Sequence, residues 1–481
     1  MKKSILVLAA TFLLLAVQAF QVQTRKQETA TAKHFISMMN RGEFKLVQSI
    51  FDTTMKQAAP EWKLRAIWTS FAKEAGKLTR ELRDTTFTYG GYEIVVVTCE
   101  FENFTQDIRV VFDKGGQIAG FFFAARHAKE GNGEKHSQLG GSPKGKAGSP
   151  AGTTHHISKD VTFKNEKANV TLAGTLTMPD STGTFPAVLL ISGSGPNGRN
   201  ETVAGHKIFE ALADYLTRHG IAVLRYDKRG VGESTGNYAS ATTMDFASDA
   251  LAGVNYLMTL KQINHKEIGL IGHSEGGEIA PIVADESPDV AFVVLMGAPG
   301  VPGYETIMDQ VAAMARASGA SDSNVTAELS IEKRFLDIVL SDKDSSTAAG
   351  EIVKLVVNEA KQDTSEAELA AGEALSPWYR AFISYNPAPA LRKLKCPVLA
   401  LWGSKDLQVP PSKNLPEVEK ELKVGGNHDI KLIEIPGLNH LFQDAKTGLP
   451  TEYGSIKESI SPKALATISD WILKQVGRKS N

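Results

Sequence analysis

One serine lies in the local sequence that a catalytic nucleophile requires. Ser274 is the central residue of the segment Gly272–Gly276 (GHSEG), which fits the pattern Gly-x-Ser-x-Gly. An apolar run, Ile268–Ile271, precedes the pattern, and a helix-like run, Glu278–Ala284, follows it. Between a strand and a helix, small glycines allow a tight turn that exposes the serine hydroxyl at a helix N-terminus. The sequence therefore predicts that Ser274 is the nucleophile of an acyl-transfer reaction.

Two further residues could activate this serine. A serine hydroxyl needs a base to take its proton, and the base needs a carboxylate to orient it. Asp406 follows the apolar run Val398–Trp402, and His440 follows the run Lys431–Ile435. Both positions correspond to the carboxyl ends of parallel strands, where ligands bind in open α/β sheets. We therefore predict a triad of the serine, Asp406 and His440. Asp444 is a rival acid, but it follows the histidine in the chain.

A loop of small residues could stabilise the negative charge that develops on the substrate oxygen. The loop Ile191–Pro196 (ISGSGP) follows an apolar run, and its small side chains allow the backbone to approach a carbonyl group. We predict that the backbone N–H groups of Ser194 and Glu275, the residue after the nucleophile, form the oxyanion hole. A phosphate-binding loop is disfavoured, because no Gly-Lys-Ser/Thr follows the glycines.

Another loop, Arg225–Ser234 (RYDKRGVGES), also follows an apolar run. It lacks the pattern Gly-x-Gly-x-x-Gly, which disfavours dinucleotide binding. We expect Asp227 and Arg229 to hold this loop together by ion pairing. A direct contact between Arg229 and substrate is the alternative.

The elements that must position these loops begin at about residue 156. A hairpin, Val161–Phe163 with Val170–Met178, is followed by apolar runs that alternate with amphipathic helical patterns. Such alternation predicts a mostly parallel sheet covered by helices on both faces. The apolar runs are Ala187–Ile191, Ile221–Tyr226, Ile268–Ile271, Val290–Met296, Val398–Trp402 and Lys431–Ile435. Residues 301–386 have helical patterns and no convincing strand, which predicts a helical cap over the active site.

Two other regions precede this catalytic domain, which we place at residues 156–481. Residues 23–125 combine helical periodicity with later strand patterns, which predicts a small α+β domain. Its expected strands are Thr86–Tyr89, Tyr92–Phe101, Gln106–Phe112 and Ile118–Ala124. Residues 126–155 are rich in Gly, Ser, Lys and Pro, which predicts a flexible linker. The small domain has no catalytic cluster, so we expect it to bind substrate, the cell envelope or a second subunit.

The first nineteen residues have the features of a signal peptide. Lys2 and Lys3 precede the apolar run Ile5–Val17, and the small-x-small segment Val17–Ala19 follows. We expect cleavage after about Ala19 and a periplasmic or extracellular enzyme. An uncleaved membrane anchor is the alternative, although the apolar run is short for a span. After cleavage we expect no stable insertion into a membrane.

Composition limits the partners of the chain. The formal net charge at pH 7 is −1, which argues against nucleic acid, because phosphate contacts require a basic surface. The two cysteines, Cys99 and Cys396, are expected to be buried free thiols. No motif calls for a metal or a cofactor, and we expect neither. The expected partner is a small-molecule ester, and a homo-oligomer is compatible with the sequence.

Together these segments resemble the α/β-hydrolase superfamily, and in particular bacterial exported carboxylesterases with a small N-terminal accessory domain of unassigned function. The resemblance extends from roughly His156 to the C-terminus and is looser in the cap. It rests on the blocks Gly193–Pro196, Tyr226–Gly230, Gly272–Gly277, Trp402–Asp406 and Asn439–His440. It implies an α/β-hydrolase fold with a helical cap and hydrolysis of short-chain acyl esters without a cofactor.

Two other functions are compatible with the same residues. The triad would also serve a serine aminopeptidase, which must bind a substrate amine through acidic residues such as Glu275 or those of the cap. A non-catalytic binding protein on a hydrolase scaffold belongs to a different class, and the complete triad disfavours it.

Overall fold

The chain divides into two compact units, one within Phe20–Thr153 and a larger one that contains Thr154–Asn481. The expected signal peptide and residues 128–155 of the expected linker lie outside the described residues. In the part of the chain that is described, no helix is long and apolar enough to cross a membrane. The computed structural model describes residues 28–52, 55–56, 59, 61–89, 92–113, 115–127, 156–361 and 364–478.

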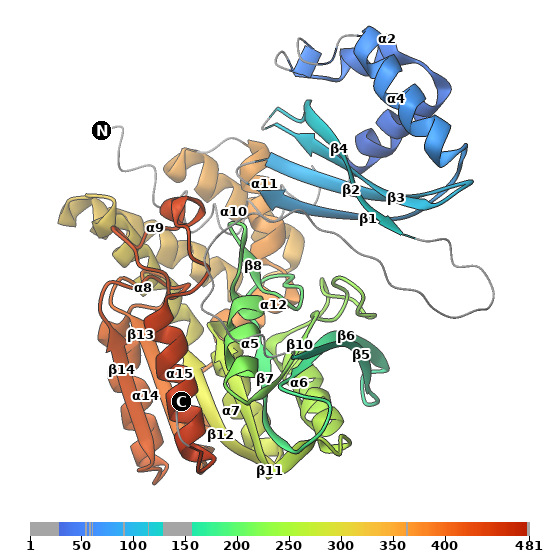
Figure 1. The fold of residues 1–481 in the computed structure, drawn as a ribbon. Helices are drawn as coiled ribbons and strands as arrows, with labels where there is room; N and C mark the ends of the chain where they lie inside the picture. Colours follow the sequence, from blue (N-terminus) through green and yellow to red (C-terminus); the bar gives the residue numbers. More distant parts are fainter. Residues whose placement is uncertain are drawn as a thin grey trace. The chain divides into compact units, whose positions relative to one another are not determined.

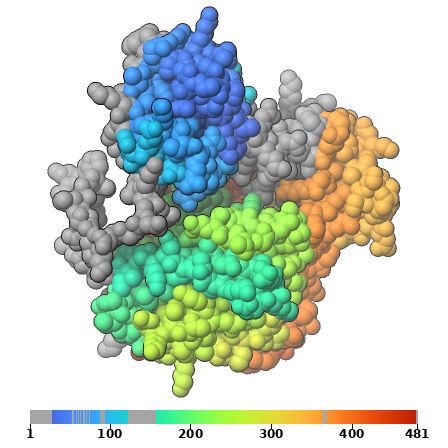
Figure 2. Space-filling view, turned by 90° about the vertical axis from the view of Figure 1, so that its right-hand side faces the viewer, coloured from blue at the N-terminus to red at the C-terminus, as the bar shows by residue number. Residues whose placement is uncertain are grey.

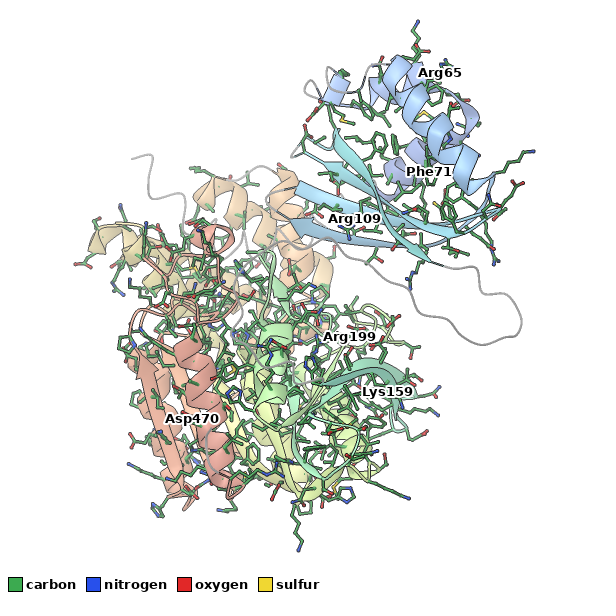
Figure 3. All side chains as sticks on the ribbon, viewed as in Figure 1. Arg65, Phe71, Arg109, Lys159, Arg199 and Asp470 are labelled. Carbon is green, nitrogen blue, oxygen red and sulfur yellow. The ribbon has the colours of Figure 1, made fainter. Side chains whose placement is uncertain are left out.

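The smaller unit packs helices against an antiparallel sheet. A helix over residues 28–41 precedes α2 (Phe44–Ser49) and α4 (Glu61–Ala75). The sheet is a meander of β1 (Leu78–Tyr89), β2 (Tyr92–Phe101), β3 (Thr105–Phe112) and β4 (Ile118–His127), in that order. The core between these layers is aromatic: Phe71 of α4, labelled in Figure 3, meets Phe101 of β2 edge-on at 5.0 Å between ring centroids. The expected α+β architecture is confirmed.

Strand β1 is longer than its sequence indicates. The expected strand began at Thr86, whereas β1 begins at Leu78. Residues 78–86 are mostly exposed, and they include the charged side chains of Arg80, Glu81 and Arg83. They pair only with β2, at the edge of the sheet. An edge strand tolerates charge on both faces, so it lacks the apolar alternation by which strands are recognised.

The larger unit contains an eight-stranded sheet (Figure 1), in the order β14-β13-β12-β11-β7-β10-β6-β5. The six strands from β14 to β10 are parallel, and the hairpin β5–β6 adds two antiparallel strands at one edge. The bounds are β5 (Ile157–Asn165), β6 (Val170–Met178), β7 (Phe185–Ile191), β10 (Ala222–Tyr226), β11 (Ile263–His273), β12 (Val290–Met296), β13 (Val398–Gly403) and β14 (Ile430–Ile435). A short ribbon, β8 (Thr202–Val203) with β9 (His206–Lys207), lies outside this sheet.

Helices cover both faces of the parallel strands. Leu190 of β7 packs with α5 (Ile208–Arg218) and α15 (Pro462–Gln475). The adjacent Leu189 belongs to the opposite cluster, with helices α6 (Thr243–Met258), α7 (Glu275–Glu286), α13 (Ala388–Lys393) and α14 (Pro411–Val424). Successive strand side chains point to opposite faces, so continuous apolar strands are what a doubly covered sheet requires.

The insertion between β12 and α13 contains helices joined by turns and no strand among its described residues, as expected for the cap. It consists of α8 (Gly303–Ala317), α9 (Asp322–Val339), α10 (Ser345–Leu355), a π-helical turn (Val356–Ala360), α11 (Thr364–Ala374) and α12 (Pro377–Ser384). Its apolar faces join the core on the α6 and α7 side of the sheet. Figure 2 shows its later helices, coloured orange, to one side of the green strands and helices of the same unit.

Both cysteines are free, as expected. Cys99 is buried, whereas Cys396 is only half-buried. Burial raises the pKa of the Cys99 thiol to about 12 and that of Cys396 to about 11. Both thiols are therefore protonated and unreactive at neutral pH.

The central sheet depends on a glycine that makes room for an aromatic ring. A Cβ atom on Gly269 of β11 would lie 2.0 Å from the ring of Phe292, which packs against Trp471 of α15. We expect Gly269→Ala to lower the free energy of unfolding by about 1–3 kcal/mol, because the ring must shift. Urea unfolding of the full chain measures this loss.

Gly350→Ala is the matched control, because a Cβ at Gly350 of α10 meets nothing within 4 Å. It should raise the free energy of unfolding by about 0.5–1 kcal/mol. Equal effects of the two substitutions would contradict this account of the sheet.

Candidate active site

Ser274 occupies a strained turn between β11 and α7. Its backbone has φ 54° and ψ −121°, a conformation that residues with a side chain rarely adopt. Its N–H donates to the carbonyl oxygen of Met296 at 2.9 Å, and its own carbonyl accepts from the N–H of Gly277 at 2.8 Å. Strain of this kind persists only where the surroundings enforce it, and it is concentrated at functional sites. The side chain is half-buried at the start of the helix.

Three glycines make this turn sterically feasible. A Cβ atom on Gly272 would lie 2.0 Å from the carbonyl oxygen of Gly276. A Cβ on Gly276 would lie 2.0 Å from the carbonyl oxygen of Ile191, and one on Gly277 would lie 2.4 Å from Cβ of Ala298. No side chain fits at these positions without a backbone shift. The glycines of the motif therefore let α7 begin directly against the ends of its neighbouring strands.

The structure brings Asp406 and His440 into direct contact. Asp406 lies in the loop after β13, and His440 lies in the loop after β14. Nδ1 of His440 is 2.8 Å from Oδ2 of Asp406, and both residues are at most 3% exposed. The other carboxylate oxygen accepts the N–H groups of Gln408 and Val409 at 2.9 and 2.8 Å. A carboxylate only accepts, so Nδ1 of the histidine carries the proton and Nε2 is left free to act as a base.

The strand ends hold the three predicted residues at one rim of the sheet. A Cβ on Gly297, after β12, would lie 3.1 Å from Oδ2 of Asp406 and 3.2 Å from Nδ1 of His440. The ring of His273, next to Ser274 in the chain, is 4.8 Å from the His440 ring. In the described part of the chain no hydrogen bond joins Ser274 to His440, and such contacts are often long in unliganded enzymes.

The rival acid has other contacts. Oδ2 of Asp444 accepts the hydroxyl of Ser461 at 3.3 Å, and the N–H of Asp444 donates to Glu458 at 3.0 Å. The carboxylate that contacts the His440 ring is that of Asp406.

His273 and Glu201 form a buried support that the sequence did not reveal. Nδ1 of His273 is 3.0 Å from Oε1 of Glu201, and Nε2 is 3.0 Å from the carbonyl oxygen of His440. Both partners only accept, so both ring nitrogens carry protons. Burial alone would lower the pKa of His273, but the Glu201 carboxylate and the two hydrogen bonds raise it above its ordinary value. A buried imidazolium thus fixes the backbone of the proposed base.

The loop predicted to bind the oxyanion is anchored at Gly193. Its N–H donates to Oε1 of Glu201 at 2.6 Å. Its carbonyl oxygen accepts Nζ of Lys228 at 2.7 Å and Nδ2 of Asn197 at 2.8 Å. Ser194, the first predicted donor, is the next residue and is exposed.

Glu275, the second predicted oxyanion donor, is the first residue of α7, and an N–H at that position has no acceptor within its own helix. Its side chain is fully buried. One oxygen accepts Thr243 and Trp378, each at 2.8 Å, and the other lies 3.1 Å from Nζ of Lys228. The expectation that this carboxylate could bind a substrate amine is therefore wrong.

Asp227 and Arg229 form ion pairs as expected, but with residues outside their loop. Asp227 pairs with Arg199, which is labelled in Figure 3, at 2.7 Å. Arg199 also donates to the carbonyl oxygen of Gly174 in β6. Arg229 pairs with Asp249 at 2.7 Å and with Asp245 at 2.8 Å, both on α6. The guanidinium of Arg229 is buried in these contacts, which disfavours the alternative of a direct contact with substrate.

The cap contains buried carboxyl groups. Glu328 and Glu332 lie one turn apart on α9 and are 4% and 2% exposed. Among the described residues, both side-chain oxygens of Glu328 and one each of Glu332 and Glu373 are buried without a hydrogen bond. Burial raises the pKa of Glu328 to about 7 and those of Glu332 and Glu373 to about 8. At neutral pH Glu332 and Glu373 are therefore mostly protonated, and Glu328 is about half protonated.

Comparison with known proteins agrees with this architecture. A family model described as "Serine aminopeptidase, S33" matches residues 197–444, just over half of the 481 residues. The chain belongs to this family. A second model, "Protein of unknown function (DUF3887)", matches residues 32–121 in the smaller unit. The protein is thus a hydrolase of the α/β-hydrolase fold with a separate N-terminal domain, which confirms the resemblance and the fold class that the sequence indicates.

Similar proteins include Esterase EstD of Thermotoga maritima, which is 26% identical over 444 residues, 92% of this chain and 94% of that protein. An uncharacterized 31.7 kDa protein of Escherichia coli is 26% identical over 211 residues, 43% of this chain and 70% of that one. Among solved structures, an esterase of Pyrococcus furiosus is 18% identical with a TM-score of 0.41, covering 66% of this chain and 91% of that one. The α/β-hydrolase GrgF of Penicillium is 17% identical with a TM-score of 0.44, covering 67% and 99%.

The buried cap carboxyls predict a specific pH dependence of stability. The folded pKa of Glu332, about 8, lies above its ordinary value of 4.5, so the folded protein keeps a proton that the unfolded chain loses. Stability should therefore fall as pH rises from about 4.5 through 8. We expect Glu332→Gln to stabilise the protein by on the order of 2 kcal/mol more at pH 8 than at pH 5.

Urea unfolding at the two pH values measures this difference. Glu305→Gln, at an exposed position of α8, is the control and should change stability equally at both. A Glu332→Gln effect that does not vary with pH would contradict burial of this carboxyl.

Proposed function

We propose that the protein is a carboxylesterase that cleaves short-chain acyl esters through an acyl-enzyme on Ser274. The observation that carries this proposal is the buried Asp406–His440 pair. It lies at the same edge of the sheet as Ser274, which occupies a strained turn. Membership of a serine hydrolase family supports it. The similarity to Esterase EstD, which extends over 92% of this chain, supports an ester as the substrate rather than another acyl compound.

In the proposed mechanism each group has one role. Nε2 of His440 takes the proton of the Ser274 hydroxyl as the serine oxygen attacks the ester carbonyl. Asp406 holds the ring by Nδ1 and stabilises the imidazolium that forms. The N–H groups of Ser194 and Glu275 bind the oxyanion. The alcohol leaves with the proton from the imidazolium, and a water molecule, activated by the same base, hydrolyses the acyl-enzyme.

A second candidate function is cleavage of a peptide bond after an N-terminal residue. The family description favours it. A substrate ammonium would need a carboxylate partner, for which the cap carboxyls Glu328, Glu332 and Glu373 are candidates. The pKa values of these groups mean that such pairing would release protons near neutral pH. Parallel assays of p-nitrophenyl esters and aminoacyl anilides separate the two: we expect turnover of the esters, and preferential turnover of the anilides would replace this proposal.

Removal of the nucleophile gives the first test of the mechanism. We expect Ser274→Ala to lower ester turnover by more than roughly 10,000-fold, because it removes the oxygen on which the acyl-enzyme forms. Ser287→Ala, at the opposite end of α7, is the control and should retain activity within about twofold. Steady-state kinetics measure the turnover of both variants, and their melting temperatures show whether they fold. Residual turnover by a folded Ser274→Ala protein would refute the assignment of Ser274 as the nucleophile.

The two acidic candidates can be distinguished in the same assay. Asp406→Asn should lower kcat on the order of 10,000-fold, because an amide at this position no longer holds His440 in the productive tautomer. Asp444 is close to His440 in the chain, but its carboxylate contacts Ser461 and not the His440 ring. We therefore expect Asp444→Asn to have a nearly normal kcat. The reverse order of effects would transfer the role of the acid to Asp444.

A further inference from the structure

One buried cation lies beneath the candidate oxyanion loop. The side chain of Lys228, in the loop after β10, is 3% exposed. Its Nζ is 2.7 Å from the carbonyl oxygen of Gly193, 3.1 Å from Oε2 of Glu275 and 4.3 Å from the centre of the Phe246 ring. An ammonium group has three N–H bonds, and these three partners give each of them an acceptor or an aromatic face. The position of Nζ is therefore fixed.

The carbonyl that Lys228 holds belongs to the peptide group whose N–H is that of Ser194. A peptide group is planar and trans, so its C=O and N–H bonds point in opposite directions. Fixing the oxygen of Gly193 on the ammonium therefore also fixes the direction of the Ser194 N–H. A positive charge at the oxygen polarises the amide and makes its N–H a stronger donor, as hydrogen bonds in series do.

We propose that Lys228 is a positioning residue of the oxyanion hole, which orients and polarises the Gly193–Ser194 peptide for the transition state. The inference rests on the proposed hydrolytic function. Lys228 does not touch the substrate in this account; it acts through the peptide. A backbone contact reinforces the arrangement: the N–H of Lys228 donates at 3.1 Å to the carbonyl oxygen of Asn197, the residue after the loop Ile191–Pro196.

Glu275 connects the same ammonium to the second predicted oxyanion donor. Its carboxylate neutralises the buried ammonium, and its backbone N–H is the second predicted oxyanion donor. The Lys228–Glu275 ion pair therefore connects the loop that carries the Ser194 N–H to the helix that carries the Glu275 N–H. Trp378 of the cap helix α12 donates to the same carboxylate at 2.8 Å, which links Lys228 and Glu275 to the cap.

The alternative is that Lys228 only compensates the charge of Glu275. The two accounts differ in what happens when both charges are removed together. A buried charge left alone is destabilising, so Lys228→Met should lower both stability and activity in either case. In the double variant Lys228→Met with Glu275→Gln neither charge remains, and stability should largely return. If Lys228 positions the peptide, activity should not return with it.

The experiment uses the full chain and measures kcat, KM and melting temperature with a p-nitrophenyl ester, and the inhibition constant of a trifluoromethyl ketone that mimics the tetrahedral intermediate. In the folded double variant we expect kcat to be roughly 10- to 100-fold below wild type with KM changed less than about threefold, since the donor acts mainly in the transition state. Affinity for the ketone should fall by a similar factor. A double variant with wild-type kcat and ketone affinity would overturn the inference.

Asn197→Ala tests the same carbonyl without placing folding at risk. Asn197 is only partly buried, and its Nδ2 donates to the Gly193 oxygen at 2.8 Å as a neutral second anchor. We expect a fall in kcat of roughly 3- to 10-fold with little change in KM. Unchanged kcat would show that the Asn197 anchor contributes nothing, and if both Lys228 variants failed to fold it would count against the inference.

The wild-type protein separates failure of this inference from failure of the proposed function. Absence of ester turnover in the folded wild type would remove the function itself. Turnover in wild type that is lost in Ser274→Ala but retained in both the double variant and Asn197→Ala would leave the esterase in place and reject the role of Lys228.

Discussion

The positive φ angle of Ser274 is the constraint on which the rest of the site depends. It turns the chain from β11 into α7 within a single residue, so the hydroxyl stands at the helix N-terminus rather than along the strand. Backbone atoms fill the space where side chains of Gly272 and Gly276 would lie. The turn therefore exists only because the neighbouring strands and α7 are pressed together by the buried core on both faces of the sheet. Packing of ordinary apolar residues is what supports the strain.

Around this turn, the buried charged groups form two supports. His273 and Glu201 connect the backbone of His440 to the N–H of Gly193. Lys228 and Glu275 connect the carbonyl of Gly193 to the start of α7. Each support pairs a cation with a carboxylate, so neither leaves an uncompensated buried charge. Such fixed dipoles need no reorganisation when charge develops on a substrate, which is the main source of electrostatic stabilisation in enzymes.

Much of this arrangement could be predicted from local sequence, and the reason lies in chain geometry. Apolar runs ending at a loop indicate strand ends, so Asp406 and His440 could be placed at one rim before any contact was known. Strand β12 covers Val290–Met296, the apolar run that the sequence indicates. The roles of Glu201 and Lys228 could not be found this way. Glu201 contacts a residue 72 positions away and Lys228 one 47 positions away, and no local pattern encodes such pairs.

The same limit explains the errors. The sequence indicates that Arg229 needs an acidic partner but not which one. Its partners, Asp245 and Asp249, lie on α6, and none comes from the loop Arg225–Ser234. Glu275 is acidic and adjacent to the nucleophile, which made it a candidate for binding an amine. Its three partners come from α6, the loop after β10 and the cap. Only the folded chain shows that its carboxylate is already occupied.

The central claim is that the turn at residue 274 presents a hydroxyl activated by the Asp406–His440 pair. Reaction of the native protein with a fluorophosphonate, followed by mass spectrometry of its peptides, tests this most directly, because only an activated serine reacts readily. The account predicts one phosphonylated residue, Ser274, with labelling lost when the protein is unfolded first. A protein that hydrolyses esters yet carries its adduct on another residue, or carries none, would contradict it.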